Sequence, residues 1–114
     1  MEVKDKRKIL IYETDKQLSL LLKEIVVSKD FEADLFQDTE DGYTAFRTNQ
    51  YDVCILELST ENRTGFNLGT DIRLLNPGIP IIFFRAVLLR GVSLMDFRES
   101  ADDYIVKSLS NYGL

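Results

Sequence analysis

Apolar runs that alternate with helical patterns are the feature that most limits how this chain can fold. Residues 8–13 and 51–58 are largely apolar, and each run carries a glutamate at or near its end. Such runs are typical of strands that are buried on both faces of a sheet. The segments between the runs place apolar residues three and four apart, as expected of helices with one buried side. This alternation predicts right-handed crossovers and a parallel sheet covered by helices on both faces.

One α/β domain, residues 1–114, accounts for these patterns, with a core at residues 8–108 and a tail at residues 109–114. We expect strands at residues 8–13, 31–36, 51–58, 80–84 and 104–106, and helices at residues 18–26, 39–49, 65–75 and 88–98. The last of these helices has the weakest pattern, because Gly91 interrupts it. The predicted fold is a doubly wound parallel sheet of five strands with a flavodoxin-like arrangement.

Composition argues against several classes of function. The net charge of −5 and the pI near 4.7 do not suit a nucleic-acid surface, which needs clustered lysine and arginine. The chain has no histidine, so it lacks the usual imidazole base and the commonest zinc ligand. Its one cysteine, Cys54, lies inside an apolar run, where we expect a buried thiol. Because no apolar stretch is long enough to span a membrane and the N-terminus is charged, we expect a cytoplasmic protein.

Charged residues follow the predicted strands at the edge where ligands of such sheets bind. Glu13 and Asp15 follow the first strand, Glu57 ends the third, and Lys107 follows the fifth. The carboxyl ends of parallel strands meet at one edge, so these side chains are expected to line a single cleft. The first turn, Glu13 to Lys16, contains no glycine and adds negative charge, which disfavours a phosphate of a nucleotide or flavin. A cluster of carboxylates instead suits a hard cation such as magnesium.

The sequence ADDYIVKS, residues 101–108, carries a family resemblance that extends over residues 9–108. The chain resembles the receiver domains of two-component response regulators. The resemblance implies a strand order of 2-1-3-4-5, an acidic magnesium-binding pair after strand one and a phosphate-accepting aspartate at the end of strand three. It also implies a serine or threonine after strand four and a lysine followed by proline after strand five. Lys107 stands at the lysine position, and Tyr104 stands at the family's switch aromatic.

Several positions depart from that pattern. Glu13 retains the first acid of the pair, but the second position is Thr14, whose neutral hydroxyl should weaken metal binding. Glu57 replaces the acceptor aspartate and carries its carboxylate one methylene farther from the backbone, which disturbs in-line phosphoryl transfer. Arg85 replaces the serine or threonine, and Ser108 replaces the proline. The family's phosphorylation positions have therefore changed while its fold signature remains.

The substituted residues are chemically compatible with one another. Glu13 and Glu57 need counter-charge where the family binds magnesium, and Arg85 and Lys107 can supply it. We therefore hypothesise a metal-free ion-pair cluster; in the alternative, Arg85 points to solvent and the acids stay hydrated. Two further residues have simpler interpretations. Asp15 serves as a helix cap rather than a ligand, and Tyr104 is a half-buried packing residue that no longer switches.

Two functions fit these residues. The first is a pseudo-receiver, a signalling module without enzymatic activity or cofactor that binds protein partners independently of phosphate. Its surfaces would be the face of helix four and strand five, or the C-terminal end, where the residues after Lys107 are too few for the family's last helix. A downstream output domain or a dimer would be its context. The alternative is a degenerate receiver that still uses Mg²⁺ and accepts phosphate on Glu57, or on Ser59 or Thr60 beside it.

Overall fold

The computed structural model describes residues 6–85 and 93–114. Their elements are β1 (Lys8–Tyr12), α1 (Lys16–Ser28), β2 (Glu32–Phe36), α2 (Thr39–Thr48), β3 (Val53–Glu57), α3 (Thr64–Leu75), β4 (Ile81–Phe84) and α4 (Leu94–Asn111). The four strands form one parallel sheet in the order β2-β1-β3-β4. The predicted α/β class, the parallel sheet and the first four strands are confirmed, because continuous apolar runs bury both strand faces.

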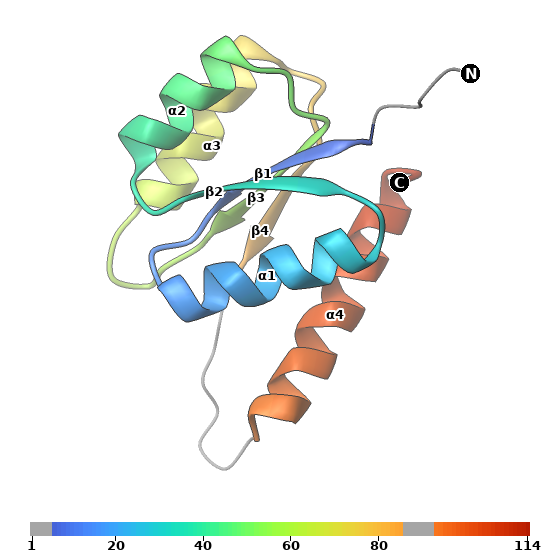
Figure 1. Cartoon of the computed structure of the whole chain (residues 1–114). Helices are drawn as coiled ribbons and strands as arrows, with labels where there is room; N and C mark the ends of the chain where they lie inside the picture. Colours follow the sequence, from blue (N-terminus) through green and yellow to red (C-terminus); the bar gives the residue numbers. More distant parts are fainter. Residues whose placement is uncertain (1–5, 86–92) are drawn as a thin grey trace, which may run out of the picture.

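The sheet lies between two layers of helices (Figure 1). α1 and α4 cover one face, and α2 and α3 cover the other. On the α1 and α4 side the core includes Ile9, Ile11, Ile25, Val53, Ile55, Ile82 and Ile105. On the α2 and α3 side it includes Leu10, Tyr12, Cys54, Leu56, Leu68 and Ile72. Successive strand residues thus contribute to opposite cores, as strand alternation requires.

Strand register places the ends of β1, β3 and β4 side by side. Tyr12 is the register partner of Leu56, and Glu57 is the register partner of Phe84. The residue after β1, Glu13, therefore lies next to the end of β3. Because all of these strands are parallel, their carboxyl ends form one edge, and this edge is where the candidate site lies.

Gly65 allows the chain to turn from β3 into α3 beneath that edge. A Cβ atom built on this residue would lie 1.7 Å from the carbonyl oxygen of Glu57. No side chain fits in that space, so only glycine lets α3 begin so close to the end of β3. The helix consequently starts directly against the backbone of Glu57.

The prediction of a fifth strand at residues 104–106 is wrong, because these residues form part of α4. Phe97, Ala101, Ile105 and Leu109 recur every four residues, which is a helical spacing. The helix buries Ala101, Ile105 and Leu109 in the core shared with α1. A strand places alternate side chains on opposite faces and could not bury these three residues together. The sheet therefore has four strands among the described residues, and the predicted order is confirmed only for these four.

α4 begins at a capping residue and lies beside α1 (Figure 1). The Ser93 hydroxyl accepts a hydrogen bond from the backbone N–H of Asp96. Of the helix predicted at residues 88–98, residues 88–92 lie outside the described residues, and the remainder is the start of α4. α4 covers the face beside α1 that the sequence had suggested would be bare. In the part of the chain that the structure describes, no helix is long and apolar enough to cross a membrane.

Candidate functional site

A cleft of about 610 Å³ lies at the carboxyl ends of β1, β3 and β4. Five of the predicted site residues line it, namely Glu13, Thr14, Asp15, Glu57 and Arg85. The loop after β3 closes its other side with residues 58–62, which include Ser59 and Thr60. The rule that parallel strands gather their ligand-binding groups at one edge thus locates this cleft correctly.

Glu13 is almost completely buried, with 1% of its surface exposed. Its Oε1 atom accepts a hydrogen bond of 3.1 Å from the backbone N–H of Asp15, whereas its Oε2 atom is buried without a partner. Burial, and then the neighbouring Glu57 carboxylate, raise the pKa of Glu13 to about 8. The side chain is therefore largely protonated at neutral pH and contributes little charge to the cleft.

Thr14 hydrogen-bonds to Glu57, the residue at the family's phosphate-acceptor position. Its hydroxyl lies 2.9 Å from both Oε1 and Oε2 of Glu57, so it donates to a carboxylate that a second acid would repel. Asp15, next along the chain, accepts a hydrogen bond of 3.0 Å from the backbone N–H of Leu18 and is the N-cap of α1. The interpretation of Asp15 as a helix cap is confirmed.

Arg85 lines the cleft, but it does not complete the hypothesised ion-pair cluster. Among the ion pairs within residues 6–85 and 93–114, none joins Arg85 to Glu13 or Glu57. Lys107 lies on α4, and its Nζ atom is 2.9 Å from Oδ2 of Asp103 in an exposed pair. Lys107 is absent from the cleft because its predicted place depended on a fifth strand.

Tyr104 also lies on α4 and contacts the outer side of β4. Its hydroxyl donates a hydrogen bond of 2.6 Å to the backbone carbonyl of Phe83, and its ring centroid is 6.1 Å from that of Phe84. With 45% of its surface exposed, it is the half-buried packing residue that the simpler interpretation predicted. Its polar tip is fixed to the backbone of the sheet and not to the cleft.

Tyr12 is a site residue that the sequence analysis missed. The residue is 2% exposed, and its hydroxyl is 2.9 Å from Oγ1 of Thr64 at the start of α3. Thr64 also donates a hydrogen bond of 2.8 Å to Oδ1 of Asn62. These bonds tie the loop after β3 to β1 and so fix the wall of the cleft. The sequence did contain a signal for this role, because Tyr12 is the one hydroxyl-bearing side chain within the apolar run of β1.

Comparison with known proteins agrees with this architecture. The model of the family described as "Response regulator receiver domain" matches residues 9–114. The chain belongs to this receiver family. A relative is the transcriptional regulatory protein RprY of Bacteroides fragilis, 38% identical over 110 residues, which are 96% of this chain and 47% of that protein. Another is CusR of Escherichia coli, 29% identical over 100 residues, which are 88% of this chain and 44% of that protein. The receiver thus spans about half the length of these relatives.

Solved structures share the fold of this receiver at low sequence identity. A CheY-like receiver domain protein from Methanospirillum hungatei has a TM-score of 0.75 and 15% identity, covering 95% of this chain and 94% of that one. TrrA from Thermotoga maritima, crystallised in complex with Mg(2+)-BeF, has a TM-score of 0.69 and 19% identity, covering 90% of this chain and 98% of that one. The doubly wound receiver architecture is therefore confirmed.

The cleft of this receiver lacks one of the acids with which the family binds magnesium. Thr14 supplies a neutral hydroxyl where the family has the second acid of the pair, and this hydroxyl is bonded to Glu57. Across the described ranges 6–85 and 93–114, no group of three or more acidic, cysteine or histidine side chains is arranged to hold a metal ion. Magnesium usually keeps several waters and is held by one or two carboxylates together with phosphate oxygens, so the replacement of the second acid by Thr14 leaves a weaker donor set for it.

Proposed function

We propose that this receiver domain is a pseudo-receiver, a non-enzymatic module of two-component signalling that acts through protein contacts without phosphorylation. The observation that carries the proposal is the bond between Thr14 and the carboxylate at the acceptor position. Thr14 hydrogen-bonds to both carboxylate oxygens of Glu57, beside a neutral Glu13. Phosphoryl transfer needs an in-line nucleophile and cations that neutralise the developing charge. In this cleft the carboxylate of Glu57 is already hydrogen-bonded to Thr14, and the cation site has lost one acid.

The contacts of Tyr104 support the same proposal. In the family, the switch aromatic responds to a hydroxyl after the fourth strand, and here that position is Arg85. The Tyr104 hydroxyl is bonded to the Phe83 carbonyl within the protein itself. The switch therefore lacks one of its two moving groups, so we expect the surface around α4 to keep one conformation.

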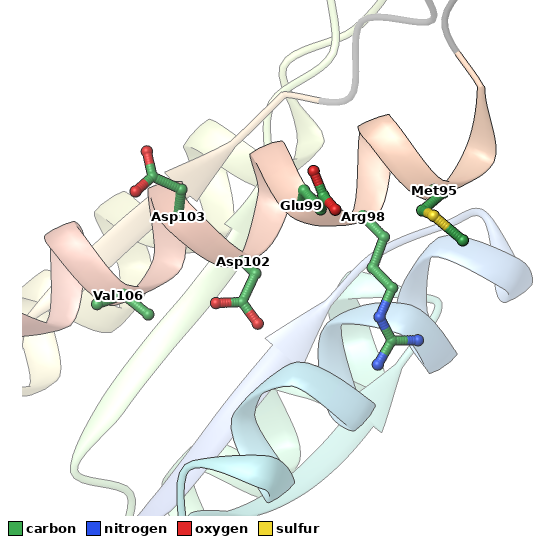
Figure 2. Close-up of a pocket in the computed structure, with 6 residues that line it drawn as sticks. All are labelled: Met95, Arg98, Glu99, Asp102, Asp103 and Val106. Carbon is green, nitrogen blue, oxygen red and sulfur yellow. The ribbon is translucent and has the colours of Figure 1, made fainter.

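The outward face of α4, together with its border with α1, is the surface we assign to a protein partner (Figure 2). A shallow hollow of about 520 Å³ lies along it, with Met95 at one end and Val106 at the other. Met95 is 71% exposed and Val106 is 42% exposed. The remaining lining residues are Arg98, Glu99, Asp102 and Asp103. The two apolar side chains suit a partner that presents apolar side chains of its own. Asp102 and Asp103 are already paired with Lys29 and Lys107 of this chain, so their charges are balanced within the domain.

Relatives indicate the kind of partner. RprY is a transcriptional regulatory protein, and TrrA has been crystallised in complex with the histidine kinase ThkA. We therefore place this domain in a two-component pathway, where a histidine kinase or an output domain would contact the α4 face. This assignment depends on family membership together with the exposed side chains of α4.

Phosphorylation provides the decisive test of the pseudo-receiver proposal. The purified chain is incubated with Mg²⁺ and a small phosphodonor such as acetyl phosphate and is then analysed by intact-mass spectrometry. We expect no phosphoryl adduct. The matched control is the double variant Thr14→Asp, Glu57→Asp, which restores the family's acids at both positions and should acquire an adduct.

An adduct on the wild-type chain would overturn the proposal and favour the degenerate but phosphorylatable receiver. Ser59 and Thr60 line the cleft beside Glu57, which is the observation that keeps this second candidate in view. Peptide mapping would then distinguish an acyl phosphate on Glu57, which is labile to hydroxylamine, from a stable ester on one of the two hydroxyls.

A further inference from the structure

The outer edge of β4 carries backbone groups that no strand pairs with. β4 pairs with β3, and within residues 6–85 and 93–114 no strand occupies its other side. The carbonyls of Pro80 and Phe84 accept hydrogen bonds from Cys54 and Leu58 on the β3 side. Successive residues of a strand direct their backbone groups to alternate sides, so those of Ile81 and Phe83 point outward. The hydrogen bond from Tyr104 to the Phe83 carbonyl independently confirms this direction.

This edge also lacks the charged side chains that usually prevent pairing with another chain. β4 reads IIFF, with no charge, whereas β2 at the opposite edge reads EADLF and carries Glu32 and Asp34. Charged residues on an edge strand oppose edge-to-edge association. Two copies of the β2 edge would bring like charges together, whereas two copies of the β4 edge would not. Of the two edges, β4 is therefore the one suited to a second copy of this chain.

The position of α3 makes the neighbouring surface complementary to itself. A Cβ atom on Gly69 would contact both Leu56 of β3 and Phe83 of β4, so α3 lies over the gap between these strands. Thr64, Asn67 and Asp71 line a cavity shared with α2. The opposite flank of α3 therefore faces outward beyond β4. Phe66 lies on this flank, 45% exposed and stacked on Phe83 at 6.3 Å between ring centroids.

The spacing of a paired sheet matches the spacing of packed helices. Neighbouring strands lie about 4.8 Å apart. If β4 of one copy pairs with β4 of another, the two α3 helices, each over the gap between β3 and β4, lie two strand spacings apart, about 10 Å. Helices pack with their axes roughly 8–10 Å apart. The same arrangement that joins the sheets thus brings the exposed Phe66 flanks of the two α3 helices into contact.

We propose that a second copy of this chain pairs its β4 antiparallel to β4, which joins the two sheets into one and packs the two α3 helices together. The two-fold axis passes beside Ile82. The outward N–H and C=O groups of Ile81 then hydrogen-bond to the C=O and N–H groups of the partner's Phe83. Phe83 bonds to the partner's Ile81 in the same way. A carbonyl has two lone pairs, so Phe83 can accept this bond and keep the one from Tyr104. The inference is independent of the proposed function, because it uses neither the cleft nor the outward face of α4.

Sedimentation velocity of the chain from micromolar to millimolar concentration tests the interface. We expect a reversible dimer that Phe66→Glu converts to monomer, because the change buries a carboxylate from each copy in the apolar α3 contact. The monomer should tolerate this change, since Arg63 lies 4.7 Å from the Phe66 ring and the site is in the first turn of α3. The control is Leu20→Glu, which places the same charge at a 52% exposed residue on α1 and should leave the dimer intact. A monomer at millimolar concentration would overturn the proposal, as would a dimer that resists Phe66→Glu or responds equally to both variants.

Amide hydrogen exchange of the unmodified chain provides a second test that does not depend on any variant. The Phe83 amide points away from β3 and should exchange rapidly at low concentration and slowly in the dimer. The Ile82 and Phe84 amides point toward β3 and should exchange at the same rate in both samples. Equal exchange of the Phe83 amide at both concentrations would refute the β4 interface even if the chain dimerises elsewhere.

Discussion

Replacement of Glu13 by glutamine should change how the free energy of unfolding depends on pH. In the folded protein the pKa of this side chain is raised from 4.5 to about 8. An unfolded chain ionises Glu13 above pH 4.5, whereas the folded chain must keep it protonated until pH 8. The stabilising effect of the proton is therefore fully present below about pH 4.5 and is lost as the pH rises toward 8.

The size of this loss follows from the two pKa values. One pH unit between them corresponds to about 1.4 kcal/mol. Between pH 5 and pH 8 the wild-type chain should thus lose roughly 3–4 kcal/mol, a large share of the roughly 5–15 kcal/mol that stabilises a domain. In Glu13→Gln the amide keeps an acceptor for the Asp15 N–H, and its NH₂ group can donate to Glu57. The variant has no proton to lose, so its stability should be nearly constant over this range.

Urea denaturation followed by circular dichroism at pH 5, 6, 7 and 8 measures the difference. The range ends at pH 8 because burial raises the pKa of the Cys54 thiol to about 12 from an ordinary value of 9, and above pH 8 this group would add its own pH dependence. We expect the two proteins to be similar in stability at pH 5 and the variant to be more stable at pH 8. Parallel pH profiles for the two proteins would show that Glu13 ionises normally and would refute the reasoning.

Two further substitutions test contacts around the cleft and β4. Gly65→Ala should destabilise the fold by more than about 2 kcal/mol, since the new Cβ would lie 1.7 Å from the Glu57 carbonyl oxygen. Thermal melting measures this loss. The control, Gly42→Ala, should be much milder, because the atom nearest to its new Cβ would be 3.6 Å away. Tyr104→Phe removes only the hydroxyl that donates to Phe83 and should cost about 1 kcal/mol; urea melts measure this loss, and an unchanged midpoint would show that the bond does not stabilise α4.

Much of the fold could be predicted because local pattern and burial agree over residues 8–84. The runs that become β1 and β3 are buried on both faces, so their continuous apolar sequence identifies them without an alternation of apolar and polar residues. The prediction at residues 104–106 failed because Tyr-Ile-Val has high strand propensity, whereas the helical repeat that includes Ala101 and Ile105 extends well beyond this window. Tertiary burial of that repeat decided the outcome.

The candidate site was predictable where it follows from topology. Glu13, Glu57 and Arg85 each follow or end a strand that was correctly identified, so the structure places all three at one cleft. Lys107 depended on the fifth strand and was misplaced with it. The bond from Thr14 to Glu57 and the retained proton of Glu13 depend on distances and burial, which sequence spacing does not specify.

The docking of α4 beside α1 also determines when the chain can complete its core during synthesis. Lys29 pairs with Asp102 at 3.1 Å across 73 residues of sequence, and Ile25 shares a core with Ile105. A chain in which the four strands pair before α4 docks therefore has a sheet whose α1 side still lacks part of its cover. Exposed apolar surface of this kind makes folding intermediates prone to aggregation. Synthesis of α4, rather than of the sheet, is the step that ends this exposure.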